Sequence, residues 1–373
     1  MNKNRIPDWF PSHPPIYDIL KTYAENASSG PFFSGMIPER TFPPEDQWID
    51  FLGYKIASPI GIPAGPLLTS NWIKLAGALG FDVVTYKTIR SEEYPAHILP
   101  NMIFVDTEGM LSEKNPKKTA LRITRPKSDI EDLAVTNSFG MPSKSPSFLM
   151  QDIPRANASL KKGQVMIVSV VGTPRPNENF LDDFVKAARL AKEAGAKIIE
   201  ANFSCPNVAK KEGCLYMSPE VVSEIGSAIV KAIHPIPLII KMGVFSSYEQ
   251  MRDVMIAAAK SGIRSVCGIN TISMAVVDAE GHPALGPDRL TAGICGGPIR
   301  KAALSFIQQA KEINDQEKLD LTIMGVGGIT VPEHFDLFLE MGADVAMTAT
   351  GMMWDPYLAL RYHELNTRNI HGR

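Results

Sequence analysis

The residues best suited to catalysis lie in the segment 200–207, which reads Glu-Ala-Asn-Phe-Ser-Cys-Pro-Asn. A short apolar run ends at Glu200 and leads into amides, a hydroxyl and a thiol, and Pro206 then ends the predicted strand. Cys205 is the one side chain of this segment that can act as a base or nucleophile near neutral pH. Because parallel α/β enzymes carry their chemistry at the C-terminal ends of strands, we expect an active site here.

The overall composition excludes several classes of protein. The 373 residues are 45% hydrophobic and 21% charged, as in a soluble globular protein, and 38 Lys+Arg against 40 Asp+Glu give a net charge of -2. No strong positive field is therefore available to recruit nucleic acid or an anionic membrane. The longest apolar runs, such as 236–240, are far shorter than the roughly 20 residues of a membrane helix. With no recognisable secretory signal, we expect a cytoplasmic protein with reduced thiols.

The cysteines and histidines predict no metal site. Cys205, Cys214, Cys267 and Cys295 form no C-x-x-C pair, and none of the seven histidines has the spacing of metal ligands. We therefore interpret the cysteines other than Cys205 as packing residues, Cys267 being a small apolar residue within a strand.

Eight strand-like runs alternate with helical patterns along the chain. The runs are 59–63, 82–87, 165–171, 197–202, 238–242, 265–270, 322–327 and 345–350. Several of the intervening helical patterns end in a glycine that would suit a left-handed cap, such as Gly80 and Gly195. This order predicts an α/β fold, a (β/α)8 TIM barrel, and no G-x-G-x-x-G motif follows the first strand to favour a Rossmann domain.

Three further regions accompany the barrel, which we place at 46–373. Residues 1–45 form an arm rich in proline and aromatics that packs on the body or a second subunit, or acts as a lid or docking surface for an electron-transfer partner. Residues 48–56 predict a small hairpin turning at Gly53. The charged segment 91–135 is too long for a simple loop, and we interpret it as either a lid or a solvated insertion on the active-site face.

Small residues follow several predicted strands. Ala64 and Gly65 follow the first strand and would let a flat ligand approach the backbone. The pair Gly327-Gly328 after strand seven and Ala349-Thr350 after strand eight fit the phosphate site that many such barrels build from backbone N–H groups. Gly296-Gly297, before a predicted helix, would add donors to the same phosphate.

Two lysines and four asparagines at strand ends favour a flavin and a pyrimidine. Burying Lys87 and Lys241 needs a compensating negative charge, which reduced flavin would supply, or which Glu200 would supply to one of them. The asparagines are Asn137, Asn202, Asn207 and Asn270. Their donors and acceptors suit a planar ring with alternating C=O and N–H edges.

As a set, these motifs resemble the dihydroorotate dehydrogenase family, whose superfamily includes the flavin domain of dihydropyrimidine dehydrogenase. The resemblance covers roughly residues 48 to 366, and its most diagnostic pieces are N-S-x-G-x-P at 137–142 and N-x-S-C-P-N at 202–207. The accompanying motifs are Lys87-Thr88, Asn270-Thr271, Gly296-Gly297 and Gly325-Val326-Gly327-Gly328-Ile329.

The resemblance implies an FMN enzyme that interconverts a dihydropyrimidine and its pyrimidine. Cys205 would move the proton at C5 while hydride passes between C6 and flavin N5. Lys87 would touch flavin and substrate, and Lys241 would meet the flavin's N1/O2 edge. The ring would be held by Asn137, Asn202, Asn207, Asn270 and Thr271, and a substrate carboxylate by the backbone of Phe139, Gly140 and Met141. The flavin would be held by Ala64, Gly65, Lys87, Thr88, Asn202, Lys241, Gly296, Gly297, Gly327, Gly328, Ala349 and Thr350.

The same resemblance implies a soluble, cysteine-base class of enzyme and a homodimer. Asn207 favours dihydroorotate, whereas the loop 211–214 and the stretch 277–284 are similar to dihydropyrimidine dehydrogenase. We therefore keep three hypotheses: oxidation of dihydroorotate; a uracil- or thymine-reducing flavin subunit that receives electrons from a partner; and a phosphate-binding barrel without redox activity.

Overall fold

A closed barrel of eight parallel strands forms the centre of the molecule. The computed structural model describes residues 16–111, 120–125, 129–177, 179–204 and 215–371. In barrel order the strands are β3 (Ile60–Ile62), β4 (Val83–Ile89), β8 (Val165–Val170), β9 (Ile198–Asn202), β10 (Leu238–Lys241), β11 (Ser265–Gly268), β14 (Thr322–Val326) and β15 (Val345–Met347). Each corresponds to one of the eight predicted runs, so the TIM-barrel prediction is confirmed.

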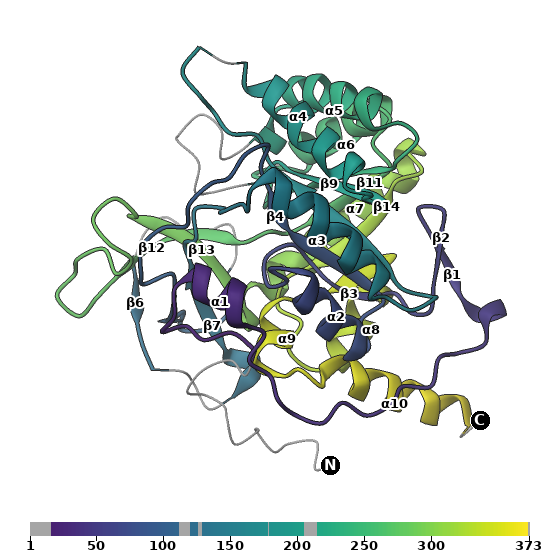
Figure 1. The fold of residues 1–373 in the computed structure, drawn as a ribbon, viewed down its shortest axis with the longest axis horizontal. Helices are drawn as coiled ribbons and strands as arrows, with labels where there is room; N and C mark the ends of the chain where they lie inside the picture. The colour runs from purple at the N-terminus through teal and green to yellow at the C-terminus, as the bar shows by residue number, and fades with distance from the viewer. Residues whose placement is uncertain (1–15, 112–119, 126–128, 178, 205–214, 372–373) are drawn as a thin grey trace.

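Helices cover the outside of the barrel (Figure 1). They are α2 (Ser70–Ala78), α3 (Pro146–Ala158), α4 (Phe180–Glu193), α5 (Pro219–Ile233), α6 (Tyr248–Lys260), α7 (Arg300–Glu317), α8 (Glu333–Glu340) and α10 (Leu358–His371), with the shorter α1 (Tyr23–Ser29) and α9 (Thr350–Trp354). Short 3-10 turns occur at Glu45–Gln47, Ile130–Asp132, Leu215–Met217 and Gly297–Ile299. Ser145, Ser218 and Ser247 cap α3, α5 and α6 by accepting a hydrogen bond from a backbone N–H of the first turn.

A β-hairpin closes the N-terminal end of the barrel. Its strands β1 (Ile49–Phe51) and β2 (Tyr54–Ile56) pair antiparallel around the predicted turn at Gly53. Phe51 and Ile56 are buried in one cluster with the first residues of the barrel strands, including Val83 and Val165. The other end of the barrel, where the strands terminate, is therefore the end that can hold a ligand.

A second sheet of five strands lies beside the barrel. β5 (Met102–Asp106), β6 (Leu121–Ile123) and β7 (Ala134–Asn137) come from the predicted insertion, and β12 (Ile272–Val277) and β13 (Thr291–Gly296) lie between β11 and α7. The order is β6-β5-β7-β13-β12, and a short parallel pairing of β12 with β6 closes the sheet. The described part of 91–135 thus contributes strands to a sheet on the left of Figure 1, and the sequence predicted none of the five strands of this sheet.

Residues 16–45 run along the body of the protein. Near one end, Tyr17 and Tyr23 are buried and pack edge-on against Phe139, at ring separations of 5.9 and 6.0 Å. Near the other end, Arg40 forms a bidentate ion pair with the fully buried Asp82, with N···O distances of 2.7 and 2.8 Å. This segment is fixed near Phe139, after β7, at one end and to the barrel at the other.

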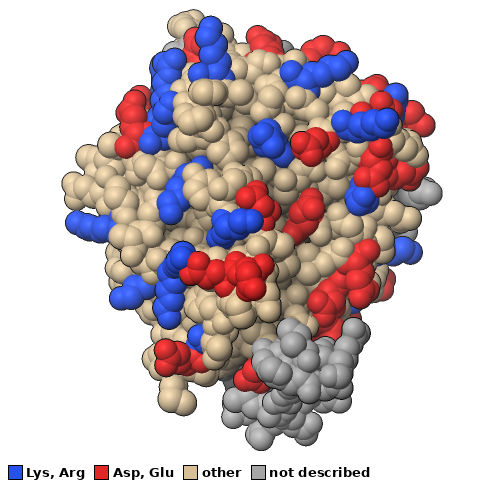
Figure 2. Space-filling view, turned by 90° about the vertical axis from the view of Figure 1, so that its right-hand side faces the viewer, with Lys and Arg blue, Asp and Glu red and all other residues tan. Residues whose placement is uncertain are grey.

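The exterior carries charges of both signs. On the face in Figure 2, Lys and Arg side chains are interspersed with Asp and Glu, which leaves no broad patch of one sign there. None of the helices in the described residues combines the length and the apolar character needed to cross a lipid bilayer.

Candidate functional site

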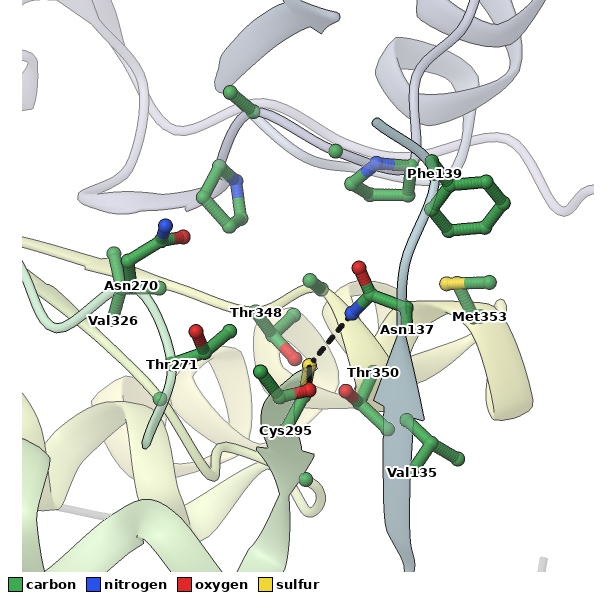
Figure 3. Close-up of a pocket in the computed structure, with 18 of the residues that line it drawn as sticks. Val135, Asn137, Phe139, Asn270, Thr271, Cys295, Val326, Thr348, Thr350 and Met353 are labelled. Carbon is green, nitrogen blue, oxygen red and sulfur yellow. Dashed lines mark hydrogen bonds between the residues drawn. The ribbon is translucent and has the colours of Figure 1, made fainter. Parts of the chain in front are cut away.

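A pocket opens where the barrel strands end, and the second sheet forms one of its walls (Figure 3). Most of the predicted site residues line it. They are Ala64, Gly65, Lys87, Thr88, Asn137, Phe139, Met141, Asn202, Lys241, Asn270, Thr271, Gly296, Gly327, Gly328, Ala349 and Thr350. Residues up to 286 positions apart in the chain therefore meet in one cavity, as strand ends of a barrel should.

The two predicted lysines are buried beside the pocket. Lys87 lies in β4 and is 7% exposed, and Lys241 ends β10 and is 2% exposed. Glu200, the alternative partner, has one carboxylate oxygen, Oε1, without a hydrogen-bond partner in the described residues. Two cations in a cavity of mainly apolar lining favour an anionic ligand, since its charge offsets the cost of burying them.

Two of the asparagines form hydrogen bonds with the backbone of Ser204, the residue before Cys205. Asn270 Nδ2 donates to the Ser204 carbonyl at 2.8 Å, and Asn202 Oδ1 accepts from the Ser204 N–H at 3.2 Å. Asn202 Nδ2 also donates to Met141 Sδ at 3.6 Å. Ser204 is 4% exposed, so β9 and the end of β11 fix the backbone immediately before Cys205.

The segment 139–141 presents unengaged backbone donors. Two of its carbonyl groups accept hydrogen bonds from Arg90. The Arg90 Nε donates to the Met141 oxygen at 2.9 Å, and the Nη2 donates to the Gly140 oxygen at 3.3 Å. The three N–H groups donate to no acceptor in the described part of the chain. Gly140 and Met141 have positive φ, 76° and 51°. Consecutive backbone N–H groups of this kind form a concavity suited to an anion.

Four predicted residues are not among those that line the pocket. Cys205 and Asn207 lie outside the described residues. Gly140 packs under the His97 ring, where an added Cβ would come within 2.6 Å of Nε2. The Gly297 N–H donates to the Leu133 carbonyl at 3.0 Å, and a Cβ there would lie 1.6 Å from the Glu131 carbonyl oxygen. Close packing of the second sheet accounts for Gly297 without a phosphate.

Sequence reasoning missed several pocket residues. Tyr17, Tyr23, Met102, Val135, Met353 and Cys295 also line the cavity. The aromatics of the N-terminal segment and Met353 carry no local signal, because only the folded chain brings them to the strand ends. The position of Cys295 directly before Gly296, a predicted cofactor residue, could have indicated it, but the sequence pattern favours a packing role.

Cys295 is a neutral thiol in the pocket wall. Burial raises its pKa to about 12, although the Asn137 hydrogen bond and the Lys241 charge act in the opposite direction. Asn137 Nδ2 donates to its sulfur at 3.1 Å (Figure 3). A thiol with this pKa is a poor base at neutral pH, so the proton transfer predicted for Cys205 is not a task for Cys295.

The described residues fit a flavin mononucleotide better than a metal ion. Among them, no cluster of three His, Cys, Asp or Glu side chains could hold a metal. The backbone at Gly65 borders open space, since a Cβ there would meet no atom within 4 Å, so a planar ring can approach it. Gly327 and Gly328 have φ of 126° and 83° and line the same cavity as the two lysines. A ring beside the lysines with its phosphate at the glycines would use both features.

Comparisons with known proteins agree with this site. The family model described as dihydroorotate dehydrogenase matches residues 112–362. A dihydroorotate dehydrogenase of Dictyostelium discoideum is 46% identical over 370 residues, which cover 97% of this chain and 100% of the relative.

More distant relatives match about half of the chain. The NAD-dependent dihydropyrimidine dehydrogenase subunit PreA of Escherichia coli K12 is 33% identical over 196 residues, which cover 51% of this chain and 45% of the relative. A dihydroorotate dehydrogenase A (fumarate) of Limosilactobacillus reuteri is 31% identical over 177 residues, which cover 47% of this chain and 54% of the relative. The alternative of a barrel without redox activity is therefore wrong. The chain is an oxidoreductase that belongs to the dihydroorotate dehydrogenase family.

Proposed function

We propose that this chain is an FMN-dependent enzyme that interconverts dihydroorotate and orotate, with Cys205 as the base that moves the proton at C5. The observation that carries the choice of substrate is the segment 139–141, whose three N–H groups have no acceptor in the described residues. A carboxylate on the ring would satisfy these donors, and dihydroorotate has one where dihydrouracil has none.

The pocket residues divide into a cofactor side and a substrate side. Lys87, Lys241 and Thr88 would hold the flavin together with Ala64, Gly65, Asn202, Gly296, Gly327, Gly328, Ala349 and Thr350. When bound, FMN would accept at N5 the hydride that leaves C6 of the ring. Asn137, Asn270 and Thr271 would hold the ring, with Asn202 and, beyond the described residues, Asn207. Asn202 and Asn270 fix Ser204, which steadies the chain from which the Cys205 thiol must reach C5.

Anaerobic reduction of the bound flavin tests the substrate. We expect dihydroorotate to bleach the flavin absorption and dihydrouracil to leave it unchanged. Bleaching by dihydrouracil alone would contradict the proposal. It would instead support a dihydropyrimidine dehydrogenase, the second candidate, which the likeness to PreA favours.

Replacement of the base tests the role of Cys205. We expect Cys205→Ala to retain FMN and to lose about 10²–10⁴-fold in turnover near neutral pH, because general base catalysis contributes a factor of that order. Cys214→Ala is the matched control and should keep wild-type turnover. Unchanged turnover in Cys205→Ala would remove this thiol from the mechanism.

The assembly and location of the protein are further parts of the proposal. We infer a homodimer in the cytoplasm. An electron-transfer subunit joins it if dihydrouracil proves to be the substrate. Sedimentation of the purified protein measures its oligomeric state, and fractionation of cells measures its location.

A further inference from the structure

The amide of Asn137 has two chemically different ends, and its orientation decides what the pocket offers to a ligand. Its Nδ2 donates to Cys295 Sγ at 3.1 Å. Its Oδ1 lies on the side of the amide away from the sulfur (Figure 3) and accepts no hydrogen bond from the described part of the chain. Asn137 therefore presents an acceptor to the pocket and keeps its donor for the protein.

The pairing of β7 with β13 brings the two side chains together. In this antiparallel pair Asn137 lies opposite Gly293, and Cys295 lies opposite Val135, so the side chains at 137 and 295 share a face. Gly293 has no side chain, and the Thr271 side chain packs in that place, since a Cβ at 293 would lie 2.4 Å from Thr271 Oγ1. The side chains of Asn137, Cys295 and Thr271 therefore lie close together around Gly293.

The single proton of the thiol sets the direction of this contact. Cys295 Sγ donates to the Gly293 carbonyl at 3.9 Å, and the raised pKa keeps that proton on the sulfur at neutral pH. The sulfur then has only lone pairs to offer to Asn137. An amide facing lone pairs must present its NH2 group, which leaves its oxygen for the cavity.

We propose that Cys295 is a positioning residue, which holds Asn137 so that Oδ1 accepts a hydrogen bond from a ring N–H of the bound pyrimidine. This inference rests on the proposed function, because dihydroorotate and orotate carry N–H groups on either side of the C2 carbonyl. Cys295 acts through Asn137 and takes no part in the transfer of the proton or the hydride.

The test measures the dissociation constant of orotate by calorimetry and the KM and kcat for dihydroorotate. We expect Cys295→Ala to raise the dissociation constant and KM about tenfold, which corresponds to about 1.4 kcal/mol, with kcat changed less than about threefold. Cys295→Ser keeps a group that both donates and accepts, so it should remain within about twofold of wild type. Cys267→Ala, which removes a buried barrel thiol that does not itself line the pocket, is the matched control and should leave KM unchanged.

A double-mutant cycle separates positioning from packing. If Cys295 acts through Asn137, Cys295→Ala should add nothing to the loss caused by Asn137→Ala. Additive losses, or wild-type orotate affinity in Cys295→Ala, would overturn the inference. If wild-type flavin is bleached by dihydrouracil alone, the proposed function fails. The cycle is then measured with uracil, whose ring carries the same N–H groups.

Discussion

The parallel barrel and the five-stranded sheet meet at one pocket but are built differently. Barrel strands such as β4 and β8 are buried at every position, whereas β12 alternates between buried and more exposed residues and β6 is largely open. Barrel strands join the next strand through a covering helix, while the second sheet combines two segments of the chain more than 130 residues apart. The barrel supplies the lysines and the glycines at 65, 327 and 328, and the second sheet supplies Asn137, Cys295 and Gly296.

This difference teaches how the site divides its tasks. A sheet buried on both faces holds charged groups rigidly, as a cofactor site requires. A sheet with one open face tolerates substitution on that face more readily. The predictions below test how firmly the two sheets are joined.

The largest effect is expected where the two chain segments of the second sheet pack most closely, between Gly297 and Glu131. In Gly297→Ala the new Cβ would lie 1.6 Å from the Glu131 carbonyl oxygen, and backbone atoms cannot yield as a side chain can. We expect the free energy of unfolding, measured in urea, to fall by about 4 kcal/mol or more.

The control for this substitution is Gly281→Ala. Gly281 has a positive φ of 91°, which adds backbone strain, but a Cβ there would meet nothing within 4 Å, so the loss should be about 1 kcal/mol. A second unfolding transition would mean that the five-stranded sheet unfolds independently of the barrel. Equal losses in the two variants would mean that the contact between Gly297 and Glu131 is loosely packed.

An intermediate effect is expected from two histidines of the barrel helices, of which His334 faces the second sheet and His363 does not. His334 lies between Glu131 and Arg300 at the junction, and His363 contacts the Gly80 carbonyl on the outside of the barrel. Burial, followed by the charge of a nearby arginine, lowers the pKa of each to about 4.

The unfolded chain therefore binds these protons first as the pH falls. The stabilisation is complete above about pH 6.5 and is lost between about pH 6.5 and 4, at up to roughly 3 kcal/mol for each histidine. Urea unfolding at pH 7.5, 5.5 and 4.5 should show a weaker pH dependence in His334→Gln and in His363→Gln. If only His363→Gln responds, the junction admits water in the native state.

The smallest effect is expected where the second sheet closes. Arg122 of β6 donates to the carbonyl oxygens of Ala279 and Asp278, at 3.2 and 3.4 Å, beside the two-residue pairing with β12. Because these bonds are exposed, Arg122→Ala should cost less than about 1 kcal/mol. Hydrogen exchange should accelerate in β6 and β12 and stay unchanged in β8. Lys55→Ala, an exposed cation of the β1–β2 hairpin, is the control. Faster exchange in β8 would show that the closure of the second sheet supports the barrel.

The same contrast explains what could be predicted from the sequence. Short apolar runs between amphipathic helical patterns identified all eight barrel strands, because each run is buried locally and repeats at regular spacing. The strands of the second sheet show no such regular alternation of apolar runs and helical patterns, and several pair with strands far along the chain. They are β5, β6, β7, β12 and β13. Their existence depends on pairing, which sequence patterns do not encode.

The site divides along the same line. Lys87, Asn202, Lys241 and Asn270 could be placed because they follow predicted barrel strands. Tyr17 and Tyr23 could not, since their approach to Phe139 depends on the path of the N-terminal segment. Gly297 shows why such a prediction is hard to make, because a glycine that serves backbone packing looks the same in a sequence as one that serves a ligand.

The ion pair between Arg40 and Asp82 has a consequence for ligand binding. It closes the segment 16–40 into a loop fastened at both ends, with the tyrosines at one end and a fully buried carboxylate at the other. Folding has already ordered this segment, so a ligand does not have to immobilise it on arrival. The aromatic wall of the pocket is preorganised, and the affinity of the site is not reduced by the entropy of arranging it.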